Sequence, residues 1–140
     1  MSIEAQLFEL REYARKENLE ILEEFQESKS AKTPGREIFG EMMAKIESDG
    51  DFGILAWHPD RLARNSIDGG RIIYTVDQKK IVSLRFPTFW FEPTPQGLFM
   101  LQVAFGCVVK NGWDLRLSDT KTIHLFVILN RTRPKRVLLN

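Results

Sequence analysis

Residues 52–57 (FGILAW) restrict the fold more than any other part of the sequence. They are nearly all apolar, and the turn pair Asp49-Gly50 comes just before them. An apolar run of this length predicts a strand that is covered on both faces, as the strands of parallel sheets are. Such a strand needs helices on both sides of its sheet, so the segment predicts an α/β fold.

Helical and strand patterns alternate around this segment. Helical spacing of apolar residues predicts a first helix that starts after Ser2, a second that starts at Thr33 and Pro34 and stops at Asp49, and two more at residues 66–78 and 96–105. Strand patterns cover residues 19–25 and 80–86. We therefore expect a three-layer α/β domain, in which an open, mostly parallel sheet is flanked by helices.

The pattern changes beyond residue 106. Residues 107–109 and 123–129 look like strands, and the polar segment 110–121 separates them. We expect one domain over residues 1–106 and a divergent tail over residues 107–140.

Charge and composition restrict the class of protein. The 20 basic and 19 acidic side chains give a formal net charge of +1, so total charge gives no reason to expect a nucleic acid or a membrane partner. The lone Cys107 excludes an internal disulfide, and His58 and His124 have no ligands at metal-binding spacing. No uncharged apolar run approaches the roughly 18 residues of a membrane span. We expect a soluble, cytoplasmic protein without a metal.

The sequence Asp60-Arg61-Leu62-Ala63-Arg64-Asn65 follows the apolar strand and carries the strongest chemical signal. Ligands of open α/β sheets bind at the carboxyl ends of strands. Arg61 and Arg64 are three residues apart, so a helical turn would bring both guanidinium groups to one side, and Asp60 would orient one of them. Two such cations suit a phosphate. The same residues also fit a solvated Asp and Arg network at a helix start.

Four motifs, which follow one another along the chain as they do in the family, resemble the catalytic domain of serine site-specific recombinases, the resolvase and invertase family. One of them is the Asp60 to Asn65 hexapeptide after a strand. The others are a helix with Gln6, a loop with Ser30 followed six residues later by Arg36, and the segment 91–97 (FEPTPQG) that leads into an apolar helix. The resemblance spans residues 2–106.

The resemblance implies a DNA strand-exchange reaction through a phosphoserine intermediate, without a cofactor or a metal. Arg61, Arg64 and Arg36 would hold the phosphate, with Asp60 orienting a guanidinium or helping proton transfer. Ser30 and Gln6 would make supporting polar contacts. The partners implied are DNA and a second protein subunit, either another copy of this chain or an intact recombinase. The second subunit would be contacted through the helix at residues 96–105.

The chain departs from this family at both ends. The family begins with a central strand carrying Tyr-x-Arg-x-Ser, which supplies the nucleophile, and these 140 residues contain no such pattern. We therefore expect an N-terminally truncated, inactive domain with its first strand missing, in which the strands at residues 19–25 and 52–57 have unpaired inner edges. In the tail, a shifted reading frame or divergence explains the loss of pattern.

Four cations near the C-terminus, Arg131, Arg133, Lys135 and Arg136, form a second candidate contact with DNA phosphate, although short basic ends are more often simply solvated.

Three functional classes remain open. The first is a recombinase catalytic domain, defective as written. The second is a non-catalytic module that dimerises with an intact recombinase, and the third is an unrelated α/β phosphate-binding enzyme that uses Arg61 and Arg64.

Overall fold

The computed structural model describes residues 2–29, 32, 34–106 and 124–129. Along the chain the elements are α1 (Ile3–Lys16), β1 (Ile21–Glu27), α2 (Glu37–Asp49), β2 (Phe52–Ala56), α3 (Pro59–Leu62), α4 (Ser66–Asp77), β3 (Ile81–Arg85), α5 (Pro95–Ala104) and β4 (His124–Leu129). The expected alternation of helices and strands is confirmed. No helix within the described ranges is both long and apolar enough to cross a bilayer.

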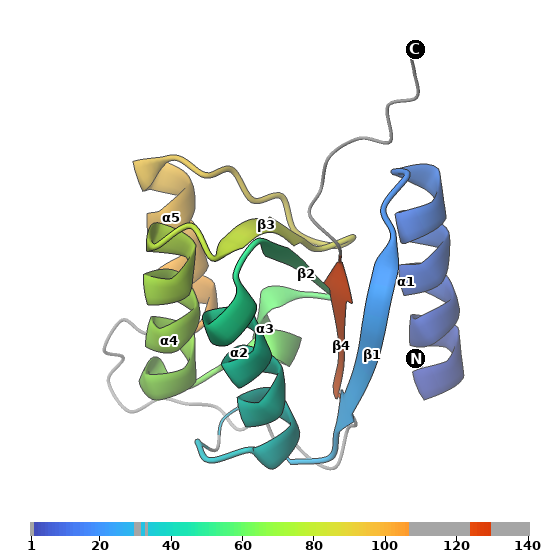
Figure 1. The fold of residues 1–140 in the computed structure, drawn as a ribbon, viewed down its shortest axis with the longest axis horizontal. Helices are drawn as coiled ribbons and strands as arrows, with labels where there is room; N and C mark the ends of the chain where they lie inside the picture. The colour runs from blue at the N-terminus through green and yellow to red at the C-terminus, as the bar shows by residue number, and fades with distance from the viewer. Residues whose placement is uncertain (1, 30–31, 33, 107–123, 130–140) are drawn as a thin grey trace.

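Four strands form one sheet in the order β1-β4-β2-β3. β2 and β3 pair in parallel, whereas β4 is antiparallel to both of its neighbours. The three strands β1, β2 and β3 therefore point the same way, and β4 runs against them (Figure 1).

The strand β4 corrects one expectation. The inner edges of β1 and β2 are not left unpaired, because β4 lies between them and pairs with both. At its centre Val127 lies opposite Glu24 of β1 and Leu55 of β2. Backbone groups at an open sheet edge need partners, and the strand-like pattern of residues 123–129 supplies them.

The helices cover both faces of the sheet (Figure 1). On one face α1 packs through Leu10 and Ala14 against Leu55 of β2 and Leu129 of β4. On the other face α2, α4 and α5 enclose the larger core. The alternation of β2, with Ile54 in one cluster and Leu55 in the other, shows that this strand is buried on both faces. The three-layer arrangement is confirmed.

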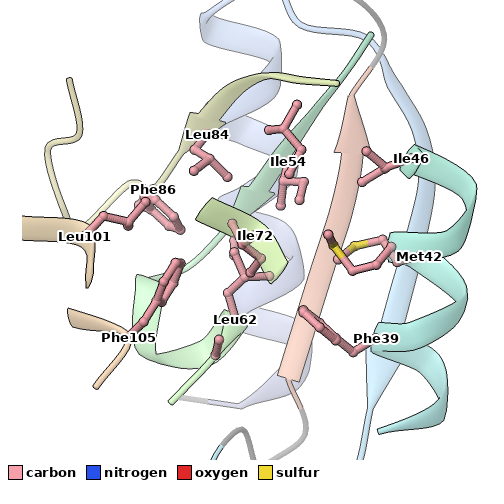
Figure 2. Packing of buried hydrophobic residues seen from close by; sticks show 14 of the residues in the cluster. Phe39, Met42, Ile46, Ile54, Leu62, Ile72, Leu84, Phe86, Leu101 and Phe105 are labelled. Carbon is pink, nitrogen blue, oxygen red and sulfur yellow. The ribbon is translucent and has the colours of Figure 1, made fainter. Parts of the chain in front are cut away.

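The larger core joins the helices of one face to the sheet. It is built of fully or almost fully buried side chains that come from every helix on that face. Figure 2 labels Phe39, Met42, Ile46, Ile54, Leu62, Ile72, Leu84, Phe86, Leu101 and Phe105 among them. Leu62 of α3 belongs to this cluster, so the short helix is anchored in the core.

Two helix starts test the sequence pattern. Ser2 caps α1, since its Oγ accepts a hydrogen bond from the Ala5 N–H at 3.1 Å, as expected. The second helix was expected to start at Thr33 and Pro34, which was wrong, because α2 begins at Glu37. The reason is Gly35, whose φ of 82° breaks the helical path two residues before that helix begins.

Candidate phosphate site

The chain turns sharply where β2 ends. His58 caps the four-residue helix α3, and its Nδ1 accepts from the Asp60 N–H at 3.3 Å. Ala63 is extended, with φ −158° and ψ 144°, and Asn65 then caps α4 by accepting from the Asp68 N–H at 2.8 Å. Since α3 ends at Leu62 and α4 begins at Ser66, only residues 63–65 connect the two helices.

Arg61 and Arg64 lie on this turn, both partly exposed. They do not share a helical turn, as the spacing had suggested, because α3 ends at Leu62 and Ala63 is extended. In the part of the chain that the structure describes, neither arginine forms an ion pair, and the Arg61 Nε is buried without a hydrogen-bond partner. Their positive charge is therefore not neutralised by a described carboxylate.

Asp60 does not orient either arginine. Its Oδ1 lies 3.0 Å from His58 Nδ1. The same nitrogen accepts from the Asp60 N–H at 3.3 Å, so both the backbone and the side chain of Asp60 face His58. The first turn of α3 folds Asp60 back onto its own cap, and among the described residues it makes no contact with an arginine, contrary to the expectation.

Arg36 lies inside the protein, with a side chain that is 0% exposed. Its Nε and Nη2 donate to Asp68 Oδ2 at 3.2 and 3.0 Å, and Nη2 also donates to the Leu62 carbonyl at 2.6 Å. Its guanidinium stacks on Phe39, 4.2 Å from the ring centroid. Burial lowers the pKa of Arg36, and the hydrogen bond and charge of Asp68 oppose this shift. The structure therefore directs this arginine towards Asp68 and not, as expected, towards a phosphate in solvent.

Two buried carboxylates were missed by the sequence reasoning. Asp68 accepts from Arg36 and also from Asn65 Nδ2 at 3.1 Å. Glu27, at the end of β1, accepts from the Phe39 N–H at 2.9 Å near the start of α2. The pair Asn65-x-x-Asp68 at a helix start is a capping pattern, so Asp68 carried a signal in the sequence. Nothing local marks Glu27, because its partner belongs to another element.

The other expected site residues are placed only in part. Gln6 lies on α1 and is 2% exposed, and its Oε1 has no hydrogen-bond partner among the described residues. No described hydrogen bond connects it to Arg36, Arg61 or Arg64. Ser30 and the cations at the C-terminus, Arg131, Arg133, Lys135 and Arg136, lie outside the described residues.

An aromatic loop follows β3 and lies beside this turn. Thr88 donates to the carbonyl of Trp57, and Phe89 meets the His58 ring edge to face at 5.6 Å. A hollow of about 650 Å³ lies along β3 and the same loop, and Trp90, which is 80% exposed, is part of its wall. None of the expected site residues lines this hollow. The arginines Arg61 and Arg64, which the sequence predicts to bind phosphate, thus lie on the turn and not in the hollow.

Comparison with known families defines the class of protein. The family model described as "Resolvase, N terminal domain" matches residues 1–107, and the chain belongs to this family. It therefore carries a serine recombinase catalytic domain. The strand β4 lies beyond the matched range. No curated protein and no solved structure matched the chain.

Proposed function

We propose that the chain is the phosphate-binding part of a DNA strand-exchange enzyme, and that Arg61 and Arg64 contact the DNA backbone. The observation that carries this proposal is the turn after β2, where two partly exposed arginines have no described ion-pair partner. Arginines of this kind neutralise the charge that develops on phosphoryl oxygens during transfer.

The nucleophile is a serine in the proposed reaction. It attacks the DNA phosphorus, the bond to one sugar oxygen breaks, and a phosphoserine linkage forms that the free end of another strand later reverses. The 140 residues contain no Tyr-x-Arg-x-Ser segment to supply this serine. We therefore propose that these residues bind DNA phosphate but do not cleave DNA.

Binding to a fluorescein-labelled 30-base-pair duplex tests the role of the two arginines. The double variant R61A/R64A should weaken binding by about tenfold at low salt, because each phosphate contact releases counterions. The matched control is R11A/R15A, which removes two cations from exposed ion pairs on α1, on the other face of the sheet. If both double variants lose the same affinity, only the total charge matters and the proposed site is wrong.

A second candidate function is dimerisation with another recombinase subunit through α5. The observation that favours it is the exposure of Phe99, Met100 and Val103, which are 58%, 54% and 45% exposed on one helix. Exposed apolar groups of this size commonly mark a protein interface. In analytical ultracentrifugation a F99E/M100E variant should be monomeric at concentrations where the unchanged chain associates. Monomeric behaviour of the unchanged chain at every concentration would contradict it.

A further inference from the structure

A buried network connects three elements next to Arg61 and Arg64. It consists of Arg36 before α2, the Leu62 carbonyl at the end of α3, and Asn65 and Asp68 at the start of α4. Asp68 Oδ2 is its centre, since it accepts from Arg36 Nε, Arg36 Nη2 and Asn65 Nδ2. The residues that carry the proposed phosphate contacts lie between Leu62 and Asn65 or beside them.

The network replaces hydrogen bonds that the turn itself cannot make. The last carbonyls of a helix have no partner within the helix, and in the four-residue α3 the Ala63 N–H satisfies only the Pro59 carbonyl, at 3.0 Å. Arg36 Nη2 satisfies the Leu62 carbonyl at 2.6 Å, immediately after Arg61 and two residues before Arg64. A buried guanidinium needs a counter-charge, and Asp68, whose side chain is 7% exposed, provides it.

We propose that Asp68 is a positioning residue for DNA binding: it holds Arg36 against the Leu62 carbonyl and thereby fixes the turn that presents Arg61 and Arg64 to a phosphate. The inference rests on the proposed function and adds to it a residue that itself touches no DNA. Asp68 acts on the two exposed arginines through Arg36 and Asn65.

A second ion pair provides a matched control. Glu47 of α2 and Arg71 of α4 pair at 2.7 Å, so this pair joins the same two parts of the fold as Arg36 and Asp68 do. It makes no described contact with the turn at residues 61–65. Removing either carboxylate should loosen the same part of the fold, but only the loss of Asp68 should disturb the turn.

The experiment is a double-mutant cycle on binding of the labelled 30-base-pair duplex, measured over a range of salt concentrations. D68N, which keeps the shape of the side chain and removes its charge, should weaken binding by about tenfold. It should also make the dependence of log affinity on log salt shallower, by about one to two in the slope, because phosphate contacts are lost. In the D68N background, R61A/R64A should weaken duplex binding by less than about a further twofold. In the E47Q background it should weaken binding as much as it does in the unchanged chain.

Each outcome decides a separate point. If R61A/R64A does not weaken binding in the unchanged chain, the proposed function is wrong. If it does, but D68N leaves affinity and salt slope unchanged or the two effects multiply, Asp68 is only structural and the inference is wrong. Circular dichroism at the assay temperature shows that each variant is folded. If D68N is not folded, D68E retains the charge but displaces the network, and the same loss of salt slope is expected.

Discussion

Glycines 70 and 97 lie in helices, yet their surroundings differ at atomic scale. A Cβ added to Gly97 of α5 would lie 1.8 Å from the Glu92 carbonyl oxygen and 2.8 Å from its carbon. A Cβ added to Gly70 of α4 would meet nothing within 4 Å. The turn before α5 thus needs a glycine, while α4 tolerates any small residue.

Alanine at these two positions should change stability in opposite directions. G97A should lower the free energy of unfolding by about 1–3 kcal/mol, since backbone atoms must move to make room. G70A should raise it by about 0.5–1 kcal/mol, because alanine favours an open helical position. Urea unfolding of both variants provides the measurement, and a stable G97A would show that the turn at Glu92 differs from the one described.

The ion pair between Glu47 and Arg71 predicts a dependence on pH. The hydrogen bond from Arg71 holds the pKa of Glu47 below its ordinary value of 4.5. A carboxyl whose pKa is lower in the folded state contributes stability above its unfolded pKa and loses it as pH falls through the folded value. Both side chains are about a third exposed, so the contribution at neutral pH should be below about 1 kcal/mol.

The melting temperature of E47Q should therefore fall less between about pH 5 and pH 3 than that of the unchanged chain. The control is E41Q, at an exposed position of α2 where the structure describes no ion pair. An identical decline in E47Q and the unchanged chain would mean that the pair does not stabilise the fold.

At the scale of elements, the strand β4 connects the two halves of the sheet. Without it β1 has no strand partner among the described residues, and α1 loses one of the side chains on which it packs. Leu129 is fully buried in that contact.

Truncation of Leu129 should therefore be costly. L129A should lower the free energy of unfolding by about 2–5 kcal/mol, the usual cost of a buried leucine. L22A on β1, where the leucine is 43% exposed, should cost less than about 1 kcal/mol. Chemical unfolding of both variants measures the difference, and equal small losses would mean that β4 does not lie in the sheet.

Local patterns predicted most elements but few of the contacts between them. The cap at Ser2 and the buried strand β2 follow from neighbouring residues alone, and both are confirmed. Neighbouring residues of a strand point to opposite faces, and Glu23 and Glu24 of β1 accordingly pair with Lys45 of α2 and Arg11 of α1. The burial of Arg36 was not predictable in this way, because its partner Asp68 is 32 residues away.

The place of β4 was likewise beyond local reasoning. The strand-like pattern of residues 123–129 is visible in the sequence, but nothing in it specifies which strands it joins or in which direction. The expectation of unpaired edges failed for this reason. At the candidate site, the role of Arg61 and Arg64 stays a prediction, and the helical face expected to carry both was wrong because the chain is extended at Ala63.

At the scale of the whole molecule, we expect no covalent chemistry from these residues alone. Incubated with supercoiled plasmid, the chain should give no protein–DNA adduct on a denaturing gel, since it has no Tyr-x-Arg-x-Ser segment. We expect no adduct at Ser2 either, because its hydroxyl caps α1 and accepts from the Ala5 N–H. A phosphoserine mapped to Ser2 by mass spectrometry would contradict this prediction.

The place of β4 also bears on how the protein is made. Val127 pairs with Glu24 across about a hundred residues of chain, so the strand that joins β1 to β2 leaves the ribosome after the other described strands. Until then α1 and β1 have emerged without the strand that connects them to β2. The apolar side of α1 should stay exposed until β4 has been synthesised, and up to that point the chain should depend on chaperones.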